Sequence, residues 1–311
     1  MQSKVLSLVL SCSLLVSSAT LVAQSATADS SIPVYTPTVT NEGLVTSIGS
    51  DSMGTLLTSW VSSYQKVQPK IQIQVSSRGS ASAPAALLEG TADIGPMTRP
   101  LKENESKNFM LKYGFEPTQI NTAFAAAYVT VNASSPYTTI SFTDLEKMFS
   151  AKPQRSTTAT DNQFVAVVLN ADAPAVQFFK QQVLLQQDWN KKVKFVTSAA
   201  DFEASLKASP RAVGISDTRG LNLVGMKTLP VSKSASDQAI KADADTIFSL
   251  SYPLARSMSI YFVKTPGEKI DASTKDFMSY VLSSQGQEIV VAQGLIPLTA
   301  DRVATERAKL E

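Results

Sequence analysis

Residues 44–67 of the chain read LVTSIGSDSMGTLLTSWVSSYQKV. The first five residues form a short apolar run that favours a β-strand, and the small polar residues 49–52 interrupt it. Apolar side chains then recur at helical spacing, which predicts one buried helix face made of Met53, Leu56, Leu57, Trp60, Val61, Tyr64 and Val67. A strand that leads into a helix through a small-residue loop is a typical unit of an α/β fold.

The same unit recurs directly downstream. Residues 71–75 alternate apolar and polar side chains, as a strand with one buried face does. The loop 76–80 follows, and Ser82 is expected to cap the next short helix. Residues 92–95 predict a third strand, which leads into a loop at 96–99. Three small-residue loops therefore follow three strands in this part of the chain.

Two longer apolar runs, 124–131 and 258–263, are expected to be strands that cross between two lobes. The sequence thus predicts an α/β protein of two lobes. The first lobe is built from residues 42–126 and 256–311, and the second is the inserted stretch 127–255. Proteins of this architecture place ligands in the cleft between the lobes, at the ends of strands and the starts of helices.

The N-terminus has the layout of a secretory signal peptide, predicted over residues 1–28. Lys4 precedes the apolar run 5–22, and small residues at 26–28 suit a cleavage site. A transmembrane helix is the alternative, because a run of this length can span a bilayer. Ser and Cys dilute the run and no basic cluster follows it, which favours a cleavable signal and a periplasmic protein. The Ser-, Thr- and Pro-rich residues 29–41 predict a flexible lead.

Composition excludes several classes of function. The chain has 28 Lys and Arg, 26 Asp and Glu, and a formal net charge of +2, which gives no strong field for nucleic acid. It contains no His, so imidazole-based catalysis and most zinc sites are excluded. Its one cysteine, Cys12, falls in the predicted signal peptide. We expect no metal, no cofactor and no nucleic-acid partner.

Helix starts in the second lobe are predicted from their capping residues. Thr143 and Glu146 have the spacing of a capping box, and so do Ser198 and Asp201. Asp172 is expected to cap the helix that opens just after it.

Three segments of the first lobe form a combined motif: GSDSM at 49–53, SRGSAS at 77–82 and ADIGPMTRP at 92–100. Together with YPLAR at 252–256 and GLIPL at 294–298, they resemble the phosphate-binding periplasmic proteins of ABC transporters. The resemblance implies a type II periplasmic-binding-protein fold with two crossover strands. It also implies a monomer that catalyses nothing, captures phosphate or a similar oxyanion in the interlobe cleft, and presents it to an inner-membrane ABC permease.

The first-lobe loops contain suitable anion ligands. Amides at a helix start are unpaired and carry partial positive charge, and hydroxyls add donors, although Ser and Thr there also serve simply as caps. By matched position the resemblance implies two hydroxyls and one amide from the first two loops, with Thr98 where the family has Asp or Ser. Two arginines in these loops are candidate cations unless they pair with Asp93 or Glu103. The candidate ligands are Ser52, Met53, Ser80, Thr98, Arg78 and Arg99.

The second lobe departs from the family pattern. The family has an Arg shortly before a Ser-Gly-Thr that opens a helix, whereas residues 169–175 here read LNADAPA. This stretch has no Arg and no hydroxyl, Pro174 has no N–H, and the carboxylate of Asp172 would repel an anion. An alternative therefore stays open, namely a diverged binding module, such as a sensor or an extracellular component, with weak or altered ligand specificity.

A hydrolase is the third hypothesis. Ser63 and Lys66 form a Ser-x-x-Lys, and residues 264–267 loosely resemble Lys-Thr-Gly, a pair found in penicillin-recognising enzymes. The pair lies near the end of the predicted helix rather than at its start, and Tyr64 between its members belongs to the buried face. We therefore expect no enzymatic activity.

Overall fold

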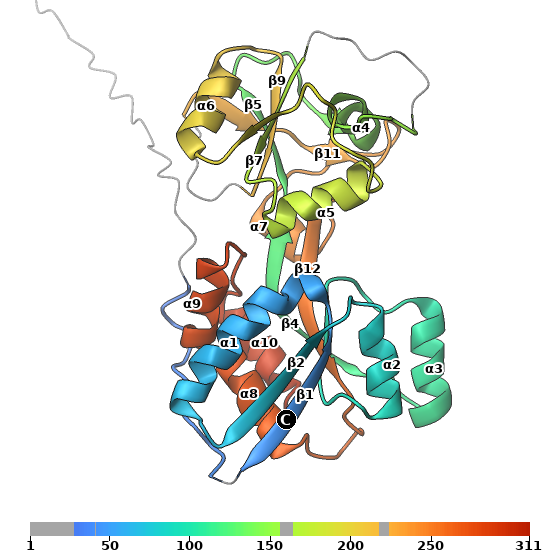
Figure 1. Cartoon of the computed structure of the whole chain (residues 1–311), viewed down its shortest axis with the longest axis vertical. Coiled ribbons are helices and arrows are strands. Elements are labelled where there is room, and N and C mark those ends of the chain that lie inside the picture. The colour runs from blue at the N-terminus through green and yellow to red at the C-terminus, as the bar shows by residue number, and fades with distance from the viewer. Residues whose placement is uncertain (1–27, 41, 156–163, 218–223) are drawn as a thin grey trace, which may run out of the picture.

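The computed structural model describes residues 28–40, 42–155, 164–217 and 224–311 of the 311-residue chain. These residues form two α/β lobes, one above the other in Figure 1, which are joined by two chain crossings. The predicted signal peptide, apart from its last residue, lies outside the described residues.

The first lobe is organised around strands in the order β2-β1-β3-β12-β4. β1 and β2 are parallel, whereas β12 runs antiparallel to both β3 and β4. Backbone hydrogen bonds, including Ile48 N to Ile94 O at 3.2 Å, connect β1 to the segment that enters β3. All eight residues of β12 are buried, as expected for a strand between two others. The strands are β1 (Gly43–Gly49), β2 (Ile71–Ser77), β3 (Gly95–Met97), β4 (Thr118–Ala126) and β12 (Ala255–Phe262).

Helices cover this lobe on both sides of the strands (Figure 1). A 3-10 turn, η1 (Asp51–Met53), leads directly into α1, which buries Leu56, Leu57, Trp60 and Tyr64 and so confirms most of the predicted apolar face. Val67, at the end of that face, is half exposed. The helices are α1 (Gly54–Val67), α2 (Ser82–Glu89), α3 (Glu103–Tyr113), α8 (Ala272–Val281), α9 (Ser284–Ala292) and α10 (Ala300–Ala308).

The second lobe repeats the same strand arrangement. Its five-stranded sheet has the order β8-β7-β9-β5-β10, in which β7 is parallel to β8 and β9, and β5 is antiparallel to β9 and β10. A separate parallel pair joins β6 and β11. The strands are β5 (Tyr128–Asn132), β6 (Ile140–Ser141), β7 (Val165–Leu169), β8 (Lys194–Val196), β9 (Ala212–Ser216), β10 (Met226–Thr228) and β11 (Val231–Ser232).

Two of the three helix caps predicted in this lobe are wrong. Helix α4 starts one residue after Ser141, which forms the capping box with Asp144, and Glu146 of the predicted box is fully buried instead. The predicted cap at Ser198 is confirmed, since its hydroxyl accepts a hydrogen bond from an amide in the first turn of α6. Helix α5 is capped by Ala173 instead of the predicted Asp172. The helices are α4 (Phe142–Phe149), α5 (Pro174–Val183), α6 (Ala199–Lys207) and α7 (Ala244–Phe248).

The two crossings between the lobes are hydrogen-bonded to each other. The first runs from β4 into β5 through Ala127, and the second enters β12 after Leu254. The amide of Ala127 donates to the carbonyl of Leu254 at 3.0 Å, and the hydroxyl of Tyr252 donates to the carbonyl of Ala127 at 2.9 Å. A motion of one lobe against the other therefore has to bend both strands at the same place. The predicted two-lobed α/β fold with two crossover strands is confirmed, although most of the predicted second run, 258–263, pairs with β4 inside the first lobe and the crossing itself lies before it, at Leu254.

Residues 28–40, here called the N-terminal strap, lie against the first lobe, although their composition predicted a flexible lead. Ile32 and Tyr35 are buried. The hydroxyl of Tyr35 donates to the carboxylate of Asp276 on α8 at 2.5 Å, and Thr38 donates to the same carboxylate through its amide and its hydroxyl. Tyr64 on α1 adds another bond at 2.7 Å. Burial alone would raise the pKa of Asp276, but these hydrogen bonds lower it below its usual value.

The described residues contain neither a membrane-spanning helix nor a metal-binding cluster. Among them, no helix combines the length and apolar character that a membrane span requires. The same residues contain no group of three or more acidic, His or Cys side chains arranged to hold a metal ion.

Candidate functional site

Three loops of the first lobe are held together by backbone hydrogen bonds at the strand ends. The amide of Ser50 donates to the carbonyl of Pro96, and the amide of Arg78 donates to the carbonyl of Gly49, both at 2.8 Å. A Cβ atom on Gly49 would lie only 2.2 Å from the carbonyl oxygen of Pro96. Only glycine permits this close approach, so the sequence itself keeps the three loops adjacent.

The same loops form one wall of a cavity between the lobes, with a volume of about 380 Å³. It lies at the carboxyl ends of β1, β2 and β3, where open α/β sheets bind their ligands. The second lobe supplies the facing wall from α5 and the residues just after it. The lining residues are Asp51, Ser52, Ser80, Thr98 and Arg99 from the first lobe, and Phe178, Gln181, Gln182 and Gln186 from the second.

The hydroxyls at positions 80 and 98 contact each other in the cavity wall. The Oγ of Ser80 lies 3.3 Å from the Oγ1 of Thr98, and it accepts a hydrogen bond from the Thr98 amide at 3.2 Å. The predicted cap of α2 is wrong, because the N-cap is Ala81 and the Ser82 hydroxyl donates to the carbonyl of Gly79. The start of α2 offers few free amides, because the Ser82 amide donates to the Gly79 carbonyl and Pro84 has no N–H.

Met53 and Arg78 do not line this cavity. The amide of Met53 donates to the carbonyl of Ser50 at 3.3 Å, and its side chain is fully buried. Arg78 is exposed, and its Nε donates to the hydroxyl of Ser76 at 3.0 Å. Four of the six predicted ligands, namely Ser52, Ser80, Thr98 and Arg99, therefore come together in one cavity.

Arg99 lines the cavity but forms a close ion pair. Its two terminal nitrogens each contact one carboxylate oxygen of Glu105 at 2.7 Å, rather than the acidic residues expected from the sequence. The hydrogen bonds with Glu105 raise the pKa of Arg99, and those with Arg99 lower the pKa of Glu105. Much of the positive charge of Arg99 is already neutralised, which weakens it as a partner for a ligand anion.

Helix α5 presents its flank to the cavity, not its N-terminus. The cavity is lined by Phe178 and by the glutamines one and two turns further along, whereas Asp172 is exposed and lies outside the lining. The predicted cap is wrong, because the N-cap is Ala173 and Pro174 is the first helical residue. Pro174 lacks an N–H that could bind an anion, as the sequence predicted. The start of α5 does not line the cavity, so this missing donor lies outside the site.

Arg256 is a buried cation beside the cavity that the sequence did not single out as a candidate ligand. It sits at the start of β12 with 6% of its surface exposed, and its Nε has no hydrogen-bond partner among the described residues. One terminal nitrogen donates to the carbonyl of Pro174 at 3.0 Å, and the guanidinium lies 5.0 Å from the ring centroid of Phe178. Burial lowers the pKa of Arg256 to about 10, opposed by the negative charge of Asp51.

The cavity wall therefore carries hydroxyl donors, and one buried charge without an ion-pair partner in the described part of the chain lies next to it, against the lining residue Phe178. Water stabilises a guanidinium by solvation, and burial removes this stabilisation. The nearest negative influence on Arg256 is the carboxylate of Asp51, which lines the cavity and accepts a hydrogen bond from the amide of Ser52 at 2.8 Å. A bound anion would add the counter-charge that the protein supplies only weakly. Only the position of Arg256 in YPLAR, at the predicted crossover, could have indicated this role.

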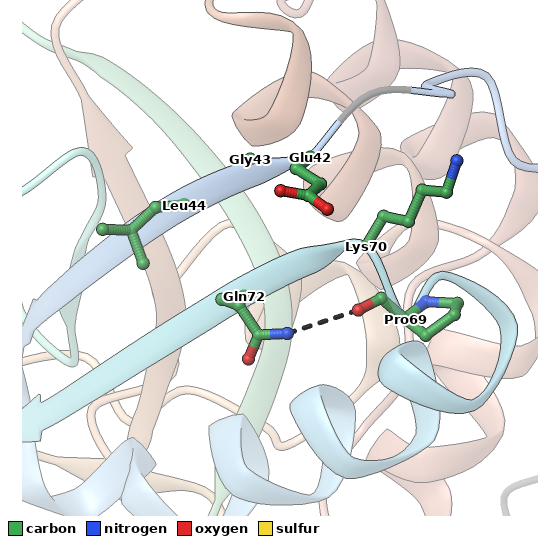
Figure 2. Close-up of a pocket in the computed structure, with 6 residues that line it drawn as sticks. All are labelled: Glu42, Gly43, Leu44, Pro69, Lys70 and Gln72. Atoms are coloured by element: carbon green, nitrogen blue, oxygen red, sulfur yellow. Dashed lines mark hydrogen bonds between the residues drawn. The ribbon is translucent and has the colours of Figure 1, made fainter.

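A second hollow, of about 640 Å³, lies at the opposite end of the first-lobe strands (Figure 2). Its polar groups bind the protein itself, since Gln72 Nε2 donates to the carbonyl of Pro69 and Lys70 Nζ donates to the carbonyl of Thr40. It lies at the amino ends of β1 and β2, away from the loops described above. Volume alone therefore does not mark the site. The lining residues are Glu42, Gly43, Leu44, Pro69, Lys70 and Gln72.

Two α/β lobes joined by two crossings, with a polar cavity between them, define a binding protein of the two-lobed periplasmic class. The family model of the PBP superfamily domain matches residues 22–285, and the chain belongs to this family.

Individual relatives agree with this assignment. The chain is 28% identical over 295 residues to the phosphate-binding protein PstS of Pseudomonas aeruginosa, with 90% of this chain and 91% of the relative covered. The fold is similar to the crystal structure of a possible phosphate binding protein from Planctomyces limnophilus, with a TM-score of 0.70, 16% identity, and 87% and 98% of the two chains covered. PstS from Borrelia burgdorferi gives a TM-score of 0.58 at 19% identity, over 82% and 99% of the chains.

Proposed function

We propose that this protein is a periplasmic solute-binding protein that captures phosphate or a similar oxyanion between its lobes for an ABC permease. The observation that carries the proposal is the convergence of three hydroxyl-bearing residues, Ser52, Ser80 and Thr98, on one interlobe cavity at the carboxyl ends of three strands. The similarity to the PstS protein of Pseudomonas aeruginosa supports phosphate as the ligand.

The first-lobe wall binds the anion by hydrogen bonds. The Ser52 hydroxyl donates to one of its oxygens, and the paired hydroxyls of Ser80 and Thr98 supply a further donor. Ser80 Oγ also accepts from the Thr98 amide, and whichever of the two hydroxyls does not donate to the other keeps its proton for the ligand.

Arg256 supplies the charge in this proposal. Among the described arginines around the cavity, Arg99 is neutralised by Glu105, whereas Arg256 has no carboxylate within ion-pair distance. It contacts Phe178 and Pro174 of the second lobe, so ligand binding near Arg256 also influences how the two lobes meet. The protein binds its solute and changes no covalent bond, closes by bending at the hydrogen-bonded crossings, and acts as a monomer.

Equilibrium dialysis of the purified protein with radiolabelled phosphate tests this function. We expect saturable binding with a Kd well below about 1 mM, reduced by unlabelled phosphate and less by sulfate. The Arg256→Gln variant should lose binding, whereas Arg78→Gln, outside the cavity, should retain it. Absence of binding below about 1 mM would contradict the proposal.

One observation favours a second candidate, a diverged module that binds a different solute. Among the described residues, the second lobe brings neither a cation of its own nor a helix start to the cavity lining, but three glutamines and a phenylalanine. A site of this kind encloses an anion from one side only. This asymmetry bears on the identity of the solute rather than on the capacity of the first lobe to hold an oxyanion.

A further inference from the structure

We infer that the cavity takes a phosphate monoester of a small polyol or sugar in preference to inorganic phosphate. The inference rests on the proposed function, because it assigns the phosphate group to the first-lobe wall. It adds a subsite on the second lobe for the esterified, hydroxyl-bearing part of the solute, formed by Gln181, Gln182, Gln186 and Phe178.

The charge distribution of the two walls carries this inference. The first-lobe wall contains hydroxyls and the charged residues Asp51 and Arg99, with the buried cation Arg256 beside it, whereas the described residues that line the second-lobe wall are all uncharged. Inorganic phosphate presents charged or protonated oxygens in every direction and loses hydration on all sides when it is enclosed. A monoester has one oxygen bonded to carbon, and that side requires no charged donor. A neutral wall opposite a donor-rich wall matches this asymmetry.

The side chains of the second-lobe wall match a hydroxylated group. Each glutamine carboxamide offers one acceptor oxygen and two donor hydrogens, so it can pair with a hydroxyl that both donates and accepts. The ring of Phe178, whose other neighbour is Arg256, provides an apolar surface for the C–H groups between hydroxyls. Gln181 and Gln186 are exposed to the cleft, which leaves their amides available to a solute.

Asp51 supports the same assignment. Its carboxylate lines the cavity and accepts one hydrogen bond, from the amide of Ser52. A carboxylate repels a fully ionised phosphate placed against it, but it is a strong acceptor for a hydroxyl proton. A solute that carries both a phosphate and hydroxyls can place each group against a suitable partner within the same cavity.

The size of the cavity agrees with a solute larger than a single ion. Its volume of about 380 Å³ lies within the range of about 300–1,000 Å³ typical of sites for small organic molecules. In this arrangement of the lobes, phosphate, with five heavy atoms, fills only part of the space, whereas a glycerol phosphate or hexose phosphate is large enough to contact both walls.

Isothermal titration calorimetry of the purified protein with inorganic phosphate, sn-glycerol 3-phosphate and glucose 6-phosphate tests the inference. We expect at least one ester to bind about tenfold or more tightly than inorganic phosphate, as expected for two additional hydrogen bonds. The double variant Gln181→Ala, Gln186→Ala should remove that preference, so that the ratio of ester affinity to inorganic-phosphate affinity falls to about one. Gln74→Ala, which removes an exposed glutamine on β2 outside the cavity, is the matched control.

The outcomes separate this inference from the proposed function. Binding of inorganic phosphate as tight as, or tighter than, that of both esters would overturn the inference and leave the proposed function intact. An equal loss for ester and phosphate in the double variant would also overturn it. Failure of all three solutes to bind would overturn both, since the first-lobe wall would then hold no phosphate group.

Discussion

The guanidinium of Arg256 stacks on the ring of Phe178 with 5.0 Å between its central carbon and the ring centroid. Arg256 begins the strand that re-enters the first lobe, and Phe178 belongs to a helix of the second. One buried charge is therefore shared by both lobes at the edge of the cavity. This contact is the most direct structural connection between the proposed site and the relative position of the lobes.

Replacing Arg256 tests the source of the positive charge. Truncating one partner of a buried, charged hydrogen bond costs about 2–5 kcal/mol, so Arg256→Gln should lower phosphate affinity by at least about 30-fold. Arg256→Lys keeps a charge but loses the planar group and should recover only part of the affinity. Calorimetry measures the affinities, circular dichroism verifies folding, and Arg78→Gln is the control. An unchanged affinity in Arg256→Gln would exclude this residue as the counter-ion.

The hydroxyl pair of the first-lobe wall is tested by near-isosteric changes. Thr98→Val and Ser80→Ala each remove one donor from the cavity, and each should weaken phosphate binding by about tenfold, the value of one hydrogen bond to a charged group. Thr91→Val, on an exposed turn, serves as the control. If the two cavity variants bind as tightly as Thr91→Val does, the anion lies elsewhere.

Gly49 is expected to tolerate no side chain. Because a Cβ would lie 2.2 Å from the Pro96 carbonyl oxygen, Gly49→Ala should separate the first and third loops and lower the free energy of unfolding by about 1–3 kcal/mol or more. Thermal denaturation followed by circular dichroism measures the loss, and phosphate affinity should fall with it. Thr58→Ala, on the exposed face of α1, is the comparison. Equal midpoints for the two variants would show that the loops have room to separate.

Asp276 should make the stability of the first lobe depend on pH. Its folded pKa lies below the ordinary value of 3.8, so its ionised form stabilises the fold above that pH, and the contribution is lost as the pH falls through the folded pKa. Asp276→Asn replaces one acceptor oxygen by a donor facing the hydroxyls of Tyr35 and Tyr64. We expect a loss of about 1–3 kcal/mol at neutral pH.

Urea denaturation at pH 7 and pH 3 measures this effect. The difference in stability between the original protein and Asp276→Asn should be largest at pH 7 and should shrink as the medium is acidified. Asp301→Asn, at an exposed position of α10, is the matched control. A difference that grows towards low pH would contradict the assigned direction of the pKa shift.

Periodicity and loop chemistry predicted much of the first lobe. The apolar face of α1, the three loops at strand ends and the two crossings all follow from local patterns, because strand–loop–helix units have strong sequence signals. Helix α3 was not predicted, since only Phe109 among its residues is buried and it has no clear apolar face. The composition of the N-terminal strap predicted a flexible segment. The strap is instead held in place by Asp276, which lies more than 230 residues away in the chain.

The candidate site was also predictable only in part, because local sequence patterns do not encode contacts between segments that are distant in the chain. Ser52, Ser80, Thr98 and Arg99 lie in short motifs, and the loops that carry them meet because neighbouring strands end together. Arg99 finds its partner Glu105 in the next helix, where neither of the expected carboxylates lies. The role of Arg256 and the glutamine wall depends on how α5 crosses the cleft, which no local pattern encodes. The cap of α4 was predicted at Thr143, two residues after the actual cap, Ser141. The sequence contains two overlapping candidate capping boxes at this position.

The crowding at Gly49 has a kinetic consequence. Since the loops of the first lobe are already locked side by side, that half of the binding surface needs no rearrangement when a solute arrives. Association should then proceed at a rate governed by encounter, and lobe closure should act mainly on the lifetime of the complex. Mutations along the paired crossings should therefore change the dissociation rate of the solute far more than its association rate.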